Sequence, residues 1–415
     1  KQLILAGHDI SAGGMITTLL EMCFANTEGG MEINLDKIKC DDIVKILFAE
    51  NPGVIIQVAD KHKSEVKKIL DEAGVGYVKI GVPTEERHIL VTKHDATYQF
   101  GIDYLRDVWY STSYLLDRKQ SMNGCAKKRF ENYKQQPLEV VFDKSFTGKL
   151  SQFGLDPDRR TPSGIKAAII REKGTNGERE MAYMLYLAGF DVKDVTMTDL
   201  VSGRETLEDI NMVVYCGGFS NSDVLGSAKG WAGSFLFNPK AKAALDNFYA
   251  RKDTLSLGVC NGCQLMMELG LITPEDKKKG KMLHNDSHKF ESAFLGVTVP
   301  MNRSVMFGSL SGSKLGIWVA HGEGKFSLPY PEDHYNVVLK YSYDEYPGNP
   351  NGSDYSVAGI ASQDGRHLAM MPHLERACFP WENAYYPLDR KDNDQITPWM
   401  EAFVNARKWV EAHKK

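Results

Sequence analysis

Cys260 stands in the setting that most clearly predicts chemistry in this chain. It lies in the motif GVCNGCQ (258–264), directly after the apolar run 255–259 and directly before the helix-like segment 265–269. In α/β enzymes, small residues at a strand-to-helix turn hold a nucleophile clear of its own backbone. A helix N-terminus beneath a thiol favours the thiolate, which is the reactive form. The sequence therefore predicts that Cys260 is a nucleophile.

A candidate base and a candidate orienting carboxylate follow in His373 and Glu375. The His-x-Glu spacing places both side chains on one side of an extended segment, so the carboxylate can reach the imidazole. In such a trio the thiolate attacks a carbonyl carbon, His373 passes a proton to the leaving amine, and Glu375 fixes the tautomer of the ring. The oxyanion that develops needs N–H donors. Asn261, directly after the nucleophile, and Gly218, in a Gly-Gly turn, are the candidates.

Other interpretations of these residues remain open. Cys260 and Cys263 form a Cys-x-x-Cys pair, which is typical of a redox centre or of half a zinc site. The chain holds no second such pair. Cys260 as a small core residue and His373 as a loop residue is the plainest alternative, but the matching Glu375 favours a catalytic trio. A stand-alone cysteine amidase or peptidase and a non-enzymatic sensing or redox module built on Cys260 and Cys263 are further alternatives.

Three other polar clusters are candidate ligand sites. Asp9 and Ser11 precede a Gly-Gly turn, and their oxygen atoms suit Mg²⁺ while a Gly-rich turn into a helix suits phosphate. A simple capped turn is the alternative there. The clusters 284–291 and 321–324 are either ordinary loops or the lining of a pocket for a polar substrate.

Length and composition limit the class of protein. A chain of 415 residues is too long for one ordinary domain. The hydrophobic content of 42% is that of a globular protein. The net charge of −4 gives no reason to expect binding to a nucleic acid or to an anionic membrane. No apolar run approaches the roughly 18 residues that span a bilayer. Seven dispersed cysteines do not form a disulfide framework, so we expect a reduced, cytoplasmic protein.

Local patterns divide the chain into three parts. Residues 1–115 mix helix and strand signals and predict an α+β module. In residues 116–162 the apolar periodicity fades, which predicts a linker region. In residues 163–415 buried-strand runs alternate with helices, which predicts an α/β domain with a mostly parallel sheet flanked by helices. The elements predicted in the first part are helices over 15–24 and 64–74 and strands over 53–58, 75–80 and 88–92.

The strands of the third part end beside the residues that carry chemistry. In a parallel sheet the site lies at the carboxyl ends of the strands. Gly217 with Gly218, Cys260, His321 and His373 each directly follow a predicted strand, so we expect them to meet at one edge. The predicted strands are 166–171, 212–215, 255–259, 317–320, 357–361 and 368–371, and a helix is predicted over 178–188.

Five motifs of the third part together resemble the phosphoribosylformylglycinamidine synthase family in its large single-chain form. They are GGFSxxDVLG (217–226), GVCNGCQ (258–264), HGEG (321–324), NPNGS (349–353) and MMPHxER (370–376). The Gly-x-Cys-x-Gly pattern alone is similar to class I, triad-type glutamine amidotransferases in general. The opening motif HDxSxGG (8–14) resembles the second synthetase half of the family, an ATP-binding module of the aminoimidazole-ribonucleotide-synthetase type. The resemblance covers essentially the whole chain, at the C-terminal end of the family's polypeptide.

The resemblance implies a complete amidotransferase reaction. Glutamine is hydrolysed through a thioester at Cys260, with Gly218, Asn261, Gln264 and His321 as the oxyanion and glutamine-binding residues. The freed ammonia travels internally to a synthetase site, because ammonia that escapes to water is protonated and ceases to be a nucleophile. There ATP activates formylglycinamide ribonucleotide, and ammonia displaces the phosphate to give formylglycinamidine ribonucleotide in purine biosynthesis.

For the first part, the resemblance implies that Asp9 ligates Mg²⁺ and that Ser11 contacts ATP. Mg²⁺ and ATP are therefore the expected cofactors. The chain opens inside a motif and without an initiator Met. We therefore expect a piece of a longer polypeptide, whose N-terminal domain and remaining synthetase domains are partners of this part. Three positions depart from the family pattern: Asn221 stands in place of Tyr, Leu374 in place of Pro, and Lys289 in place of Arg.

Overall fold

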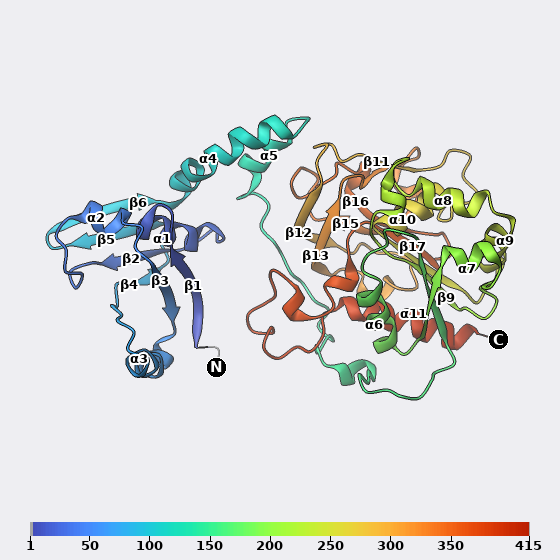
Figure 1. The fold of residues 1–415 in the computed structure, drawn as a ribbon, viewed down its shortest axis with the longest axis horizontal. Helices are drawn as coiled ribbons and strands as arrows, with labels where there is room; N and C mark the ends of the chain where they lie inside the picture. The colour runs from blue at the N-terminus through green and yellow to red at the C-terminus, as the bar shows by residue number, and fades with distance from the viewer. Residues whose placement is uncertain (1–2, 415) are drawn as a thin grey trace. The chain divides into compact units, whose positions relative to one another are not determined.

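The computed structural model describes residues 3–414 and divides the chain into two compact units (Figure 1). Unit 1 comprises Lys1–Lys119 and unit 2 comprises Gln120–Lys415. By its contacts, most of the predicted linker region belongs to unit 2. The domain boundaries predicted at 115 and 162 stay predictions. Among the described residues, no helix combines the length and the apolar character needed to cross a membrane.

Unit 1 is built on two small sheets. One is four-stranded with the order β4-β2-β5-β6, and the other is the antiparallel pair of β1 and β3. Alternate residues of β5, Ile89 and Val91, are buried in one cluster with Ile16 and Leu19 of α1, as expected for a strand with one face on a core. The strands are β1 (Ile4–Ile10), β2 (Gly30–Asn34), β3 (Gly53–Val58), β4 (Gly81–Thr84), β5 (His88–Lys93) and β6 (Ala96–Gly101). The helices are α1 (Gly14–Phe24), α2 (Ile43–Phe48), α3 (Lys63–Glu72) and α4 (Ile102–Gln120).

The elements predicted for the first part are confirmed with one exception. The strand predicted over 75–80 is wrong, because these residues carry no regular secondary structure and β4 begins only at Gly81. Val75 is 51% exposed and Val78 is 48% exposed. A β-branched residue favours a strand when its side chain packs on a pleated, half-buried surface, and this segment has no such surface.

Unit 2 is built on a nine-stranded sheet with the order β13-β12-β15-β16-β17-β10-β9-β7-β8. Parallel pairing joins β17, β10, β9, β7 and β8. Antiparallel pairing adds β16, β15, β12 and β13 beside β17. The strands are β7 (Lys166–Arg171), β8 (Asp191–Thr196), β9 (Met212–Tyr215), β10 (Leu255–Val259), β12 (Glu291–Thr298), β13 (Lys314–His321), β15 (Asn336–Tyr341), β16 (Val357–Ala361) and β17 (His367–Met370), and β11 (Lys281–Leu283) pairs separately with β14 (Lys325–Ser327).

Helical connections account for the parallel part of the sheet. α6 connects β7 to β8, and α10 packs on β9, β10 and β17. The described chain contains no α-helix between α10 and α11, so the strands from β12 to β16 are joined by loops, and such connections favour antiparallel neighbours. The predicted α/β class is confirmed, and β10, which leads into Cys260, belongs to the parallel part. The helices are α6 (Glu178–Ala188), α7 (Met197–Ser202), α8 (Lys229–Leu236), α9 (Pro239–Ala250), α10 (Asn261–Glu268) and α11 (Trp399–His413).

The predicted linker region lies partly against the sheet of unit 2. It contains the helix α5 (Cys125–Asn132). Farther along, the Val141 N–H donates to the Lys314 carbonyl at 2.7 Å, and the Lys314 N–H donates to the Val141 carbonyl at 3.0 Å. Main-chain pairing of this kind fixes the segment beside β13.

Candidate active site

Cys260 occupies a strained turn between β10 and α10. Its φ of 53° and ψ of −109° are a combination that residues with a Cβ rarely adopt. The close packing of α10 on β9 requires Gly262, because a Cβ there would lie 2.0 Å from the Tyr215 carbonyl oxygen. The Cys260 N–H donates to the Met370 carbonyl at 2.9 Å, which ties the turn to the end of β17. The predicted nucleophile therefore has the backbone geometry of a nucleophile elbow.

His373 and Glu375 form a buried pair directly after β17. His373 Nδ1 lies 2.7 Å from Glu375 Oε1, and the two residues are 3% and 0% exposed. Burial by itself lowers the pKa of His373, but the Glu375 charge and a hydrogen bond with Cys260 outweigh it and raise the pKa to about 10. Because Glu375 engages Nδ1, Nε2 is the ring nitrogen left available for proton transfer. The structure thus brings the three predicted residues together, with the imidazole held in its protonated form.

Two N–H groups at the site are suited to stabilise an oxyanion. Gly218 lies after β9 with a φ of 123°, and its neighbours are tied to the 174–176 segment by two hydrogen bonds of 2.9 Å. Among the described residues, none accepts a hydrogen bond from the Gly218 N–H. Asn261 is the first residue of α10, so its N–H has no acceptor within the helix. Within residues 3–414, neither N–H donates to another group of the chain, so both can donate to a ligand.

A side chain at residue 217 would disturb the site. An alanine Cβ there would lie 2.7 Å from His373 Cε1 and 3.4 Å from Cys260 Cβ, so the buried imidazole would have to move. Displacement of a reacting group by an ångström costs about 100-fold in rate. We expect Gly217→Ala to lower kcat/KM for the reaction at this site by about 10- to 100-fold. The control is Gly233→Ala in α8, where the Cβ would meet Phe237 at 3.7 Å, and equal losses in both variants would contradict the prediction.

The side chains of Asn261 and Gln264 bond within the protein. Asn261 Oδ1 accepts from the Ser220 N–H at 3.1 Å, and its amide nitrogen donates to Gln264 Oε1 at 2.8 Å. Gln264 Nε2 donates to the Glu323 carbonyl at 2.8 Å. These bonds connect the elbow to the loop after β9 and to the turn after β13. Contact of Gln264 with glutamine stays a prediction.

His321 ends β13 and is 2% exposed. Neither of its ring nitrogens has a hydrogen-bond partner in another residue of the described chain. Burial, and then the positive charge of His373, lower the pKa of His321 to about 4, so the ring is neutral. A buried neutral imidazole with two open nitrogens can donate one hydrogen bond to a ligand and accept one.

A cleft of about 660 Å³ lies beside the loop that follows β9. In this loop Asn221, Ser222 and Asp223 all have left-handed φ angles between 48° and 58°. Asp223 also lies 3.4 Å from the Asn261 amide nitrogen, so the cleft adjoins the elbow. Its charged and titratable lining residues are Asp223, Lys229, His284, Asp286, His288, Glu323 and Lys325.

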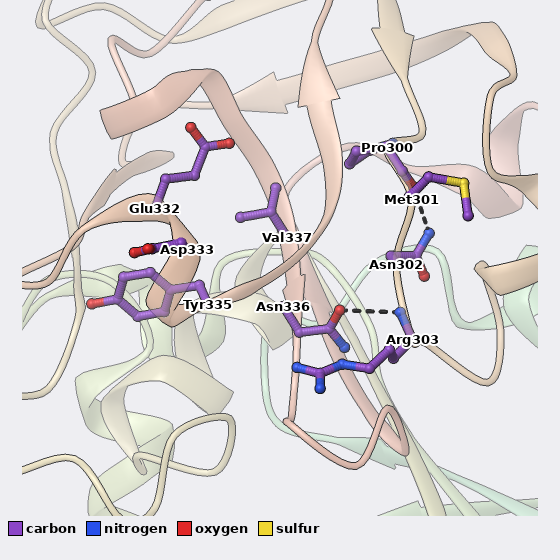
Figure 2. A pocket seen from close by; sticks show the side chains of 9 residues that line it. All are labelled: Pro300, Met301, Asn302, Arg303, Glu332, Asp333, Tyr335, Asn336 and Val337. Atoms are coloured by element: carbon purple, nitrogen blue, oxygen red, sulfur yellow. Dashed lines mark hydrogen bonds between the residues drawn. The ribbon is translucent and has the colours of Figure 1, made fainter.

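Figure 2 shows the residues that line a second cleft, of about 620 Å³. Residues 300–303 of its lining follow β12, which runs antiparallel to β13, so this cleft lies at the end of the strands opposite His321. Two of its charged side chains are engaged elsewhere, since Arg303 donates to Gln363 at 2.6 Å and Lys340 donates to Glu332 at 2.9 Å. None of the residues predicted to act in catalysis lines it.

The structure does not favour a redox or zinc centre at Cys260 and Cys263. Cys263 is fully buried, and burial raises the pKa of its thiol well above the ordinary value of 9.0. Within residues 3–414, no group of three or more His, Cys, Asp or Glu side chains is arranged to hold a metal ion.

Asp9 and Ser11 in unit 1 do not form a metal or nucleotide site by themselves. The Asp9 side chain is 71% exposed, and its neighbour His8 pairs with Glu21 at 2.9 Å. The Gly13 N–H, at the start of α1, donates to Glu50 Oε1 at 2.9 Å, so a carboxylate already takes this anion position. One exposed carboxylate beside an occupied helix start does not complete a site for Mg²⁺ and phosphate.

Comparison with known proteins agrees with this geometry. Residues 164–410 match the family described as the CobB/CobQ-like glutamine amidotransferase domain, and the chain belongs to this family. Residues 1–93 match the AIR synthase related protein, C-terminal domain. The chain is 38% identical, over 99% of its length, to the probable phosphoribosylformylglycinamidine synthase of Arabidopsis thaliana, and 37% identical, over 99%, to phosphoribosylformylglycinamidine synthase of Homo sapiens.

The match covers 30% of the Arabidopsis protein and 32% of the human one, so the chain spans about a third of the length of these curated relatives. Among solved structures, PurLQS from Thermotoga maritima aligns with 26% identity and a TM-score of 0.44, covering 60% of this chain and 99% of that one. The predicted resemblance to the phosphoribosylformylglycinamidine synthase family and the predicted glutamine amidotransferase domain are confirmed.

Proposed function

We propose that this chain is the glutaminase part, with an adjoining synthetase module, of a phosphoribosylformylglycinamidine synthase. The observation that carries the proposal is the buried trio of Cys260, His373 and Glu375 at the elbow of an amidotransferase domain. Glutamine hydrolysis supplies ammonia, and the synthetase reaction uses ATP to convert formylglycinamide ribonucleotide to formylglycinamidine ribonucleotide. The family match and the names of the relatives support this assignment.

Each step of hydrolysis has a residue suited to it. The Cys260 thiolate attacks the side-chain carboxamide carbon of glutamine, and the N–H groups of Gly218 and Asn261 receive the oxyanion. The protonated His373 gives its proton to the departing nitrogen, so ammonia leaves and a thioester remains. His373 then takes a proton from water, which attacks the thioester and releases glutamate. Glu375 holds the ring in the orientation that serves both transfers.

The cleft beside the elbow supports an amino acid as substrate. Burial, chiefly, and the neighbouring Glu323 raise the pKa of Asp223, which indicates a site that gains from a nearby cation. An α-ammonium group supplies such a cation. Lys229, which has no ion-pair partner among residues 3–414, is suited to an α-carboxylate. Cys260 is only 5% exposed, which suits a slender side-chain amide better than the peptide bond of a folded protein.

The ATP-dependent synthetase reaction is also part of the proposed function. ATP would supply activation of the amide oxygen as a phosphate ester, with Asp9 toward Mg²⁺ and Ser11 toward the nucleotide, once the partner domains of a longer polypeptide complete that site. The cytoplasmic location stays a prediction, since the Arabidopsis relative is named as chloroplastic or mitochondrial.

A glutamine-shaped electrophile tests the proposal. We expect a chloroketone analogue of glutamine to alkylate Cys260 alone among the seven cysteines, because Cys260 lies at the elbow with His373 as a neighbouring base. Peptide mapping by mass spectrometry identifies the labelled residue, and excess glutamine should protect it. Labelling of another cysteine, or labelling that glutamine does not slow, would contradict the assignment. Efficient hydrolysis of peptides by the same chain would favour the stand-alone hydrolase instead.

A further inference from the structure

Asn285 is the centre of a buried network beside the candidate active site. It is fully buried, and three of its polar groups bond to the main chain of the turn 321–324. Its amide nitrogen donates to the His321 carbonyl at 2.7 Å, its backbone N–H donates to the Gly322 carbonyl at 2.9 Å, and its Oδ1 accepts from the Gly324 N–H at 3.0 Å. One side chain with its own N–H therefore determines the path of this turn.

The turn 321–324 forms part of the wall of the site. The Cys260 thiol donates to the carbonyl of Ala320, the preceding residue, at 3.6 Å. The Glu323 carbonyl accepts from Gln264 on α10, and His321 carries the two unpartnered ring nitrogens. Movement of the turn would displace these groups relative to the nucleophile.

The loop 284–290, which carries Asn285, is held from its other side by residues 122–132. The Met122 N–H donates to the Ser287 carbonyl at 3.0 Å, and the Asn123 amide donates to the Asp286 carbonyl at 2.8 Å. On α5, Arg129 Nη2 donates to Glu291 Oε2 at 2.9 Å. All these residues belong to unit 2.

Glu291 connects these contacts. Its carboxylate is buried and accepts from Ser287 Oγ at 2.5 Å and from the Tyr346 hydroxyl at 3.1 Å, as well as from Arg129. The Arg129 guanidinium also lies over the Tyr346 ring, 4.9 Å from its centroid. Glu291 stands directly opposite His321 in the pairing of β12 with β13. Removal of Arg129 would take a paired charge away from a buried carboxylate, which is strongly destabilising.

We propose that Arg129 and Glu291 are positioning residues for glutamine hydrolysis: their ion pair holds the loop 284–290, through which Asn285 sets the turn 321–324 and His321 beside Cys260. This inference rests on the proposed glutaminase function. Neither residue touches the reacting atoms, so both act through Asn285. The helix α5 is then a support of the active site rather than a simple connection.

The test compares Arg129→Ala with Arg159→Ala in the full 415-residue chain. Arg159 is a matched control, since it pairs with Asp191 at 3.0 Å and lies 4.9 Å from the centroid of the Tyr186 ring, away from the loop 284–290. The readouts are kcat and KM for glutamine, and the rates at which Cys260 is alkylated by the glutamine chloroketone and by iodoacetamide.

We expect Arg129→Ala to slow turnover and chloroketone labelling by about 10- to 100-fold while iodoacetamide alkylation changes little, because the thiol itself is intact. Arg129→Lys should restore part of the rate, and Arg159→Ala should behave as the wild type. Equal rates in Arg129→Ala and Arg159→Ala would overturn the inference. Where Arg129→Ala does not fold, Glu291→Gln keeps the shape of the side chain, and a wild-type rate in that variant overturns it too. Absence of labelling in the wild-type chain would count against the proposed function instead.

Discussion

Replacing Cys260 with alanine is expected to abolish glutamine turnover, with a loss of at least about 10⁴-fold in kcat. The reason is that no thioester can form, while the oxyanion donors Gly218 and Asn261 stay in place. Steady-state release of glutamate and ammonia measures the effect. Residual catalysis within tenfold of the wild type would show that another group performs the chemistry.

Two further substitutions separate chemistry from structure at this turn. Cys263→Ala removes a buried thiol three residues away and should retain most of the activity, which excludes a general effect of cysteine loss on α10. Cys260→Gly should be as inactive as Cys260→Ala but more stable, by about 1 kcal/mol, because glycine tolerates the φ of 53°. Urea unfolding of both variants measures the difference. A glycine variant less stable than the alanine variant would argue against strain at the elbow.

Glu375→Gln is expected to lower kcat by about 10³- to 10⁴-fold. The Glu375 charge is the main influence that raises the pKa of His373 against the effect of burial. Without that charge the imidazole is no longer held protonated to give its proton to the leaving nitrogen. The carboxamide that replaces the Glu375 carboxylate can also stabilise the wrong tautomer of the His373 ring. Measurement of kcat from pH 6 to 10 should therefore show a large loss across the neutral range. A loss below tenfold would contradict the orienting role.

The same substitution should change the pH dependence of stability. The pKa of His373 is raised from its ordinary value of 6.5 to about 10 in the folded protein. The native state then binds this proton more tightly than the unfolded state, so the stabilisation is fully present below about pH 6.5 and is lost as the pH rises through about 10. In Glu375→Gln this slope should flatten. Urea midpoints at pH 6.5 and 9.5 for both proteins measure it, and identical slopes would contradict the charge assignment.

Local sequence patterns were sufficient to place most elements near the nucleophile. β7, β9, β10, β16 and α6 have the predicted bounds, because short apolar runs and a glycine stop are strong local signals. Where α5 forms, the sequence predicts only a linker region. The residues of α5 include Lys127, Lys128 and Arg129, so the apolar periodicity is weak, and its stabilising contacts come from residues far along the chain.

Local patterns also did not predict the antiparallel part of the sheet or the hydrogen-bond network that supports the site residues. Strand direction depends on how strands are connected and paired, and a run such as 357–361 has the same apolar character in either direction. The clusters 284–291 and 321–324 were recognised as polar, but their mutual hydrogen bonds through Asn285 arise only after folding.

The sequence by itself is enough to predict the type of chemistry in this protein. Cys260, His373 and Glu375 were identified because small residues and a His-x-Glu spacing directly follow buried strands, and the carboxyl ends of parallel strands meet at one edge. Only the tertiary structure decided the protonation of His373, the neutrality of His321 and the support that Arg129 and Glu291 give to the site. Those properties depend on burial and on partners distant in sequence, which no local pattern records.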